Sequence, residues 1–330
     1  MAPVTDTGRP ATIRRKRAGP RVLPGRRAAY IYIAPFFVVF LAFSVYPWLD
    51  TAWVSLHSVR LSTYNTQTWV GLGNYRNLFG NSFFWNALRN TVTIGILATV
   101  PQLCMALGIA HLLNYKMRGR TFFRVAVLMP YATSLAAAAI IFLQLFDKDI
   151  GFINFMLTHI GLPRVDWQGS KWPSQIAVAA IVTWRWTGYN ALIYLAGIQA
   201  IDPSLYEAAA LDGAGRWKQF LNVTVPGLRP TILFTIVVST IGASQLFGEP
   251  LLYHNGMPDG GNQGQYQTLG LLMYQQGFAN DQLGLASATA WTMFVIIVLA
   301  VLLNLFLTRR REGRPRRRDR IDSAVAEVTL

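Results

Sequence analysis

The sequence has one cysteine and few charged residues. The first excludes a disulfide-stabilised fold, and the second disfavours a soluble domain. Cys104 stands alone inside an apolar run, so a framework of intrachain disulfides is excluded. Only 14% of the 330 residues are charged, whereas a soluble domain carries roughly 25%. The chain is 52% hydrophobic, and its mean hydropathy is +0.31. These values favour a membrane protein over a soluble one.

Motifs of catalysis and metal binding are also missing. No G-x-x-x-x-G-K-[ST] phosphate loop, H-E-x-x-H zinc helix or G-x-S-x-G nucleophile turn occurs. The histidines do not have the spacing of metal ligands; they are His57, His111, His159 and His254. We therefore predict no catalytic residue, no metal site and no cofactor in this chain. If ATP drives the protein, a separate subunit must bind it.

Positive charge is concentrated at the two ends of the chain. A net charge of +15 would suggest a nucleic-acid partner in a soluble protein. Here the arginines cluster in residues 1–28 and 309–330, on either side of the apolar runs. Basic segments in these places are typical of cytoplasmic tails. We predict two basic cytoplasmic tails, a bilayer as the surrounding medium and no nucleic-acid partner.

Six apolar runs lie between the tails, each long enough to be read as a membrane-spanning helix. They cover residues 30–48, 91–113, 122–146, 175–198, 231–247 and 285–307. The first run could be a cleaved signal peptide, but it is longer than such a region and lacks a small-residue cleavage site. Six spans place both tails on one side, which agrees with their shared charge. We predict an all-α polytopic membrane protein whose six-span domain covers residues 29–308.

The segment from 201 to 230, IDPSLYEAAALDGAGRWKQFLNVTVPGLRP, is polar yet has helical spacing. Asp202 and Pro203 form a helix start, because the side chain accepts from free amides and the ring fixes φ. Asp212 and Gly213 predict a turn. We expect a cytoplasmic helix-turn-helix that presents one surface to a partner; a hairpin that only connects two spans is the alternative. A DNA-binding helix-turn-helix is disfavoured because the segment is short and tethered at both ends.

The motif within this segment resembles the EAA loop of permease subunits from bacterial binding-protein-dependent ABC importers. The residues that carry the resemblance are Glu207, Ala208, Ala209, Asp212, Gly213, Ala214, Phe220 and Pro226. VGLGNYRNLF, FFWNALRNT and LAGIQAIDPSLYEAA are similar to the carbohydrate-uptake branch, maltose/cellobiose-type, whereas NGMPDGG departs from the usual NGGP or GGGP. The resemblance extends from about Tyr30 to Leu307.

This resemblance implies a role for the loop and a set of partners. The loop would dock into a groove of a cytoplasmic ATPase subunit, with Glu207 contacting the ATPase and Gly213 forming the turn. The implied partners are a second permease subunit, two ATPase subunits that hold Mg-ATP, and an external solute-binding protein. The implied location is the bacterial inner membrane.

Two clusters are candidates for a substrate path. The fourth span carries Trp184, Arg185, Trp186, Tyr189 and Asn190 near its centre, and an arginine at that depth must face protein or water. Aromatic faces stack on sugars and Arg or Asn bonds their hydroxyls, so the cluster suits a carbohydrate. Alternatively, the tryptophans pack against helices and Arg185 pairs with an acid such as Glu249. The resemblance adds Ser239 and Gln245 of the fifth span, and Glu249 just after it, to the path.

We therefore expect a permease subunit, not an enzyme, of an ATP-driven importer for a disaccharide or oligosaccharide. The phrase QLFGEPLL resembles importers of cellobiose. The alternative is an ion-coupled secondary transporter of a small polar solute, a class that usually shows intramembrane acids or paired broken helices in repeated halves. The spans show no such acid and no evident repeat, and a membrane enzyme is a weaker rival still.

Overall fold

The computed structural model describes residues 26–115 and 118–312, so most of the two predicted basic tails lies outside the described residues. The chain divides into two units, Met1–Asp50 and Thr51–Leu330, and each is described by itself. Helices dominate both units, in agreement with the predicted class.

The N-terminal end of the described chain is a single helical stretch with a local change of pitch, and its residues 51–55 already belong to the second unit. Helix α1 (Arg26–Phe40) continues through the π-helical turn η1 (Leu41–Val45) into α2 (Tyr46–Ser55). Pro47 has no amide to continue the i→i−4 hydrogen bonds, and a π turn directly before it accommodates the mismatch. The apolar part, Tyr32–Ser55, is long enough to cross a membrane. It extends seven residues beyond the predicted end at Trp48.

The second unit contains the remaining helices and one very short hairpin. The helices that cross most of the unit are α4 (Ser82–Asn114), α8 (Lys171–Gln199), α12 (Arg229–Ser244) and α15 (Leu283–Glu312). The shorter ones are α3 (Gly73–Gly80), α5 (Arg120–Ala132), α6 (Leu135–Leu145), α7 (Phe152–His159), α9 (Pro203–Leu211), α10 (Arg216–Gln219), η2 (Phe220–Thr224), α11 (Val225–Gly227), α13 (Gly248–Tyr253), α14 (Leu269–Tyr274) and η3 (Gln275–Ala279). Strands β1 (His57–Ser58) and β2 (Thr68–Trp69) pair antiparallel, a small departure from an all-α chain.

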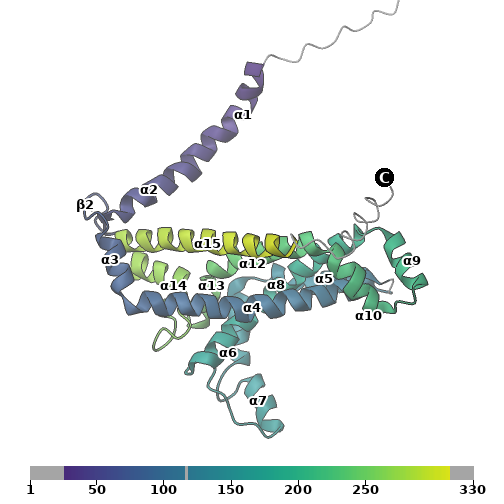
Figure 1. The fold of residues 1–330 in the computed structure, drawn as a ribbon. Helices are drawn as coiled ribbons and strands as arrows, with labels where there is room; N and C mark the ends of the chain where they lie inside the picture. Colours follow the sequence, from purple (N-terminus) through teal and green to yellow (C-terminus); the bar gives the residue numbers. More distant parts are fainter. Residues whose placement is uncertain (1–25, 116–117, 313–330) are drawn as a thin grey trace, which may run out of the picture. The chain divides into compact units, whose positions relative to one another are not determined.

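Helices α4 and α8 share the most extensive helix–helix interface of the second unit. Alanines are fully or almost fully buried along it: Ala98, Ala106 and Ala110 on α4, and Ala177 and Ala191 on α8. Small side chains let two helix backbones approach closely, which is how helices associate in a bilayer. The α4 helix, about 50 Å long, has α3 and α14 at its N-terminal end and the α9–α10 hairpin at its C-terminal end (Figure 1).

The third predicted span, 122–146, is not one straight helix. Helices α5 and α6 are bent by 91° at the two residues between them. Pro130 removes one hydrogen bond from the last turn of α5, and Thr133 then has an extended backbone with ψ 139°. Its hydroxyl donates to the carbonyl of Met129, which further closes the helix end. The third predicted span therefore consists of two helices that meet at a sharp bend.

The other spans are present as helices, but their bounds differ from the prediction. Helix α4 begins nine residues before position 91 because Asn81 caps it, accepting a hydrogen bond from the amide of Phe83 at 2.9 Å. The stretch before α12 is bent by 67° relative to it. Helix α15 continues to Glu312, so the first four residues of the predicted tail, 309–312, are helical.

The count of membrane spans follows from length and composition. Among the described residues, three helices are long and apolar enough alone, and five qualify if each bent pair is one span. The three are Tyr32–Ser55, Ser82–Asn114 and Leu283–Leu307. Helix α8 has 29 residues, roughly 44 Å, but includes Lys171 and Arg185. A six-span topology requires α8 to cross the membrane as well, so that count stays a prediction.

A substitution at Gly188 tests the close contact between α8 and α5. A Cβ at this position would lie 1.8 Å from the carbonyl oxygen of Val127, a backbone atom that cannot rotate away. We expect Gly188→Ala to push α5 from α8 and to lower the free energy of unfolding by about 2 kcal/mol. The matched control is Gly108→Ala on α4, where nothing lies within 4 Å. Thermal unfolding of the purified variants in lipid nanodiscs measures both; equal stability would contradict the close approach.

Candidate functional site: a central cavity and a helical hairpin

The hairpin begins as the sequence predicts, with an aspartate cap. The carboxylate of Asp202 accepts a hydrogen bond from the amide of Ser204 at 2.9 Å, and Pro203 occupies the first turn of α9. The hydrogen bonds from Ser204 hold the pKa of the Asp202 carboxyl below its ordinary value, because they stabilise the charged form. The first helix of the hairpin is therefore defined by local chemistry.

The turn of the hairpin is a Schellman motif centred on glycine. Gly213 has φ 74°, a left-handed conformation that L side chains rarely adopt. The amide of Ala214 donates to the carbonyl of Ala209 at 2.9 Å, and the amide of Gly213 donates to that of Ala210 at 3.0 Å. Together these bonds satisfy the end of α9 and reverse the chain toward α10. Asp212 is the C-cap residue that immediately precedes the turn.

Aromatic contacts fasten the base of the hairpin to the C-terminal end of α4. Phe220 is buried, and its ring centroid lies 4.6 Å from that of His111 on α4. The guanidinium of Arg216 lies over the ring of Tyr115, 5.1 Å from its centroid. Movement of the hairpin and movement of the end of α4 are consequently linked by packing.

The outer part of the hairpin is exposed. Leu211 is 90% exposed and Trp217 is 68% exposed, unusual values for large apolar side chains. Glu207 is exposed as well and has no ion-pair partner among the described residues. Ala208 is exposed, while Ala209, Ala214 and Pro226 are half-buried. The hairpin thus combines a fixed base with an exposed outer face that carries both apolar and charged side chains.

A central cavity of about 620 Å³ lies between α4, α8, α12 and α13. Six of the eight residues predicted for a substrate path line it, namely Trp186, Tyr189, Asn190, Ser239, Gln245 and Glu249. Trp184 and Arg185 do not. Residues of α8 and residues of the segment from α12 to α13 are thus brought to one cavity, about halfway along α4.

Arg185 acts on the cavity through Glu249. Its Nη1 lies 2.9 Å from Glu249 Oε1, and the two side chains are 16% and 8% exposed. This is the ion pair that the sequence left open as an alternative role for Arg185. Trp184 likewise packs, with its ring centroid 5.5 Å from that of Phe142. Neither Trp184 nor Arg185 lines the cavity. The ion pair with Arg185 nevertheless holds Glu249, which does line it.

Glu249 belongs to α13, a short helix that folds back after α12 ends. Three contacts hold this region: the Arg185 pair, a bond from Tyr253 Oη to the carbonyl of Trp167 at 3.1 Å, and one from Thr268 Oγ1 to the carbonyl of Leu246 at 2.5 Å. The break between α12 and α13 therefore forms a supported wall of the central cavity.

Residues of α4 were missed by the sequence analysis. Thr99 and Gln102 line the central cavity. Gln102 is 4% exposed and borders the cavity. Its amide can both donate a hydrogen bond to a ligand in the cavity and accept one from it. The signal available in the sequence was a glutamine in the middle of an apolar run.

The aromatic side chains of α8 are held by stacking. The ring of Tyr189 stacks on Tyr131 of α5, with centroids 4.9 Å apart, and Trp186 meets the same ring edge-on at 5.3 Å. The α5 helix therefore holds the two aromatic side chains of α8 that line the cavity, Trp186 and Tyr189. Because α5 is bent sharply against α6, that position depends on the break at residues 133–134.

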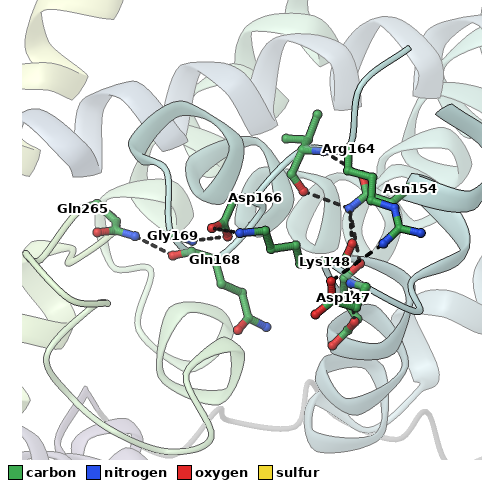
Figure 2. A network of polar contacts seen from close by, with 10 residues as sticks. Asp147, Lys148, Asn154, Arg164, Asp166, Gln168, Gly169 and Gln265 are labelled. Atoms are coloured by element: carbon green, nitrogen blue, oxygen red, sulfur yellow. Dashed lines mark hydrogen bonds and ion pairs between the residues drawn. The ribbon is translucent and has the colours of Figure 1, made fainter. Parts of the chain in front are cut away.

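A polar network fixes the loop between α6 and α8 (Figure 2). Asn154 donates from Nδ2 to the carbonyls of Lys148 and Val165, each at 2.9 Å, and its Oδ1 accepts from the amide of Val165 at 3.0 Å. Lys148 pairs with Asp166 at 3.0 Å. The amide of Gly169, then Lys148, hold the pKa of the Asp166 carboxyl below its ordinary value. Nearby, Gln265 Nε2 donates to the carbonyl of Gln168 at 2.5 Å, which ties this loop to residues 254–268 (Figure 2).

Substitutions of Arg185 and Glu249 test how much their ion pair contributes to the free energy of unfolding. Glu249→Gln leaves the Arg185 charge buried without a counter-charge, and we expect a loss of about 3 kcal/mol in the free energy of unfolding. Arg185→Gln has the converse effect. The double substitution should cost less than the sum of the two single ones, because neither charge remains. Thermal unfolding in nanodiscs measures this, and strictly additive losses would show that the two charges do not interact.

Comparisons with known proteins agree with the architecture. The family described as "Binding-protein-dependent transport system inner membrane component" matches residues 92–313. A lactose transport system permease protein of Rhizobium radiobacter is 33% identical over 287 residues, which are 86% of this chain and 94% of that protein. An arabinooligosaccharides transport system permease protein of Bacillus subtilis (strain 168) is 33% identical over 323 residues, 95% of this chain and 99% of that one.

A solved structure has the same fold. A chain of the bacterial alginate ABC transporter, crystallised in complex with an alginate pentasaccharide-bound periplasmic protein, superposes with a TM-score of 0.72. The match covers 87% of this chain and 96% of that one at 24% identity. Together with the family match over residues 92–313, these likenesses show that the chain belongs to the family of binding-protein-dependent transport system inner membrane components.

Proposed function

We propose that the chain is the permease subunit of an ATP-driven importer and forms part of the path for a neutral disaccharide or oligosaccharide. The observation that carries the proposal is the central cavity, which lies halfway along the helix whose end holds the hairpin. As a member of its family the chain is a transport component, not an enzyme. ATP hydrolysis takes place on partner subunits.

The cavity lining supports a neutral sugar. Among the residues that line the cavity, Glu249 is the charged side chain, and Arg185 balances it. The remaining polar groups are amides and hydroxyls, such as those of Gln102, Asn190 and Ser239, which pair with sugar hydroxyls as donors or acceptors. Aromatic rings supply apolar faces for stacking. The volume of about 620 Å³ is within the range of small-molecule sites, roughly 300–1,000 Å³.

The similar proteins support the same substrate class. Their names refer to lactose and arabinooligosaccharides. We infer that this chain works with an external solute-binding protein and a second permease subunit. Cellobiose is the first sugar to test, because of the QLFGEPLL sequence.

The hairpin is the proposed contact with the ATPase subunits. Its apolar outer residues, Leu211 and Trp217, are exposed beside the unpaired carboxylate of Glu207. An ATPase groove that covers them would gain apolar contact and an ion pair. Phe220 and the ring of His111 then transmit the movement to α4, which lines the central cavity. In this arrangement both tails and the hairpin are cytoplasmic, and α3 and α14 lie at the outer end.

Substitutions of two glycines in the hairpin test whether the hairpin couples the ATPase subunits to sugar uptake. Gly213→Ala places a side chain at φ 74°, which costs about 1–2 kcal/mol and distorts the turn. We expect the variant to lose most of the ATP-driven uptake and to co-purify with less ATPase. Gly215→Ala is the control, because its φ of −63° suits alanine and open space surrounds it.

Glu207→Ala extends this test to the outer face. We expect weaker ATPase capture, measured by co-purification from membranes, with unchanged amounts of folded permease. Normal uptake and normal ATPase recovery in both Gly213→Ala and Glu207→Ala would rule out the hairpin as the docking element.

Hydroxyl and amide groups of the central cavity provide a second test. We expect Gln245→Ala and Ser239→Ala to raise the KM of sugar uptake about 3- to 10-fold, since each removes roughly one hydrogen bond to the sugar. Ser244→Ala on the same helix is the control, because its hydroxyl bonds the carbonyl of Thr240 and does not line this cavity. Uptake by the complete importer in proteoliposomes, with cellobiose and lactose, measures the effect. Equal kinetics in all three variants would contradict the assignment.

A further inference from the structure

A second pocket, of about 260 Å³, lies at the N-terminal end of α4, opposite the hairpin. It is formed where residues 81–83 meet the 259–267 loop and the segment 272–285 that leads into α15. We call it the outer pocket. It shares no lining residue with the central cavity and lies outside the hairpin.

The lining of the outer pocket consists mainly of carboxamides. Besides those of Asn81 and Gln267, they belong to Asn262, Gln263, Gln275, Gln276, Asn280 and Gln282. Asp259 is the charged residue among those that line the pocket, and its carboxylate lies 2.5 Å from Nδ1 of His254. Each carboxamide both donates and accepts hydrogen bonds, as a sugar hydroxyl does. Such a lining matches a neutral polyol better than an ion.

One buried group lacks a partner in this pocket. Gln267 is 2% exposed, and its Nε2 donates to Gln275 Oε1 at 2.5 Å. Its Oε1 has no hydrogen-bond partner among the described residues. A buried acceptor in this state costs about 1–3 kcal/mol. A hydroxyl donor that enters the pocket and reaches this oxygen would recover that energy.

An aromatic ring stands at the edge of the same pocket. Phe83, in the first turn of α4, is 56% exposed. Asn81 caps that turn through the amide of Phe83, which fixes the backbone from which the ring projects. An exposed ring beside convergent amides offers an apolar surface for the C–H face of a sugar.

The loop that forms the pocket is held in place before any ligand arrives. Asn86 and Asn90 of α4 donate to the carbonyl of Gly264 at 2.7 and 2.8 Å. Gln175 of α8 donates to the carbonyl of Gln265 at 2.7 Å, and the Gln265 side chain bonds the network of the α6–α8 loop (Figure 2). A loop ordered by such bonds loses little entropy on binding.

Glycine is required for this loop geometry. Gly260 and Gly261 have φ of 68° and 89°, and a Cβ on either would lie within 2.4 to 2.7 Å of Gln267 or Tyr266. The loop can therefore fold tightly over Gln267 only without side chains at these two positions. This is the local reason why the amide groups converge on one pocket.

The outer pocket adjoins the wall of the central cavity. Directly after Gln267, the Thr268 hydroxyl donates to the carbonyl of Leu246, a residue that lines the central cavity. A Cβ on Gly270 would lie 3.0 Å from the same carbonyl oxygen. The floor of one site and the wall of the other are therefore in direct contact.

We propose that the outer pocket is a second sugar subsite, which binds one end of a neutral oligosaccharide on the outer side before the sugar enters the central cavity. The inference rests on the proposed function, since it assigns an entry position on the same path. Phe83 stacks on the sugar ring, the free carboxamides bind its hydroxyls, and Gln267 Oε1 accepts a bond from one of them.

The test measures binding at the outer pocket separately from passage through the central cavity. Purified full-length protein in lipid nanodiscs, free of glycoside detergents, is examined by saturation-transfer difference NMR with lactose, cellobiose and cellotetraose. The pocket variant is Asn262→Ala/Gln263→Ala, which removes two exposed amides without hydrogen bonds to the described residues. The control is Asn65→Ala, an exposed amide outside this pocket. Gln245→Ala reports on the central cavity.

The expected result is at least a fivefold loss of affinity for the bound sugar in the pocket variant, and no change in the control. In the complete importer, the pocket variant should also raise the KM of uptake at an unchanged maximal rate. Unchanged affinity in the pocket variant together with weaker binding in Gln245→Ala would overturn the outer subsite while leaving the proposed function intact. Weaker capture of the solute-binding protein with an unchanged sugar signal would also overturn it, in favour of protein docking. Failure of all three sugars to bind or to be transported would overturn both.

Discussion

The close packing of α4 against α8 is the constraint on which the rest of the second unit depends. Fully buried alanines on both helices bring the backbones together, and Thr183 of α8 bonds the carbonyl of Ala98 across the contact at 3.1 Å. Lipid chains are as apolar as a protein core, so close contact, rather than exclusion of water, holds helices in a bilayer. Because α4 contributes to the outer pocket, the central cavity and the base of the hairpin, one rigid helix sets the distances among all three.

The hairpin was predictable because its structure is decided by neighbouring residues. Asp202 caps its own helix and Gly213 supplies the left-handed turn, so the residue types in order specify the shape. The lining of the central cavity was predicted in part. Polar residues of α8 and α12 stand out from apolar surroundings, but whether Gln102 of α4 faces them depends on how α4 and α8 are rotated against each other. That rotation follows from packing over the whole interface.

The features that sequence reasoning missed are those made by distant segments. The outer pocket joins residues near position 82 to residues near 265, and hydrogen bonds such as Asn90 to Gly264 bring them together. No periodicity in either segment indicates such a bond. The 91° bend between α5 and α6 was also missed. Pro130 was visible in the sequence, but a proline near the end of an apolar run permits a kink within one helix as well as a break between two, so the residue types alone do not fix the angle.

The buried pair of Arg185 and Glu249 has an electrical consequence. A single charge that crosses a membrane potential of 100 mV gains or loses about 2.3 kcal/mol. A guanidinium and a carboxylate that stay 2.9 Å apart move as a neutral unit, so the potential does almost no work on them. If α8 and α13 shift together as the cavity opens toward one side and then the other, this pair contributes no gating charge. The polar centre of the chain can therefore change its surroundings without drawing on the voltage across the membrane.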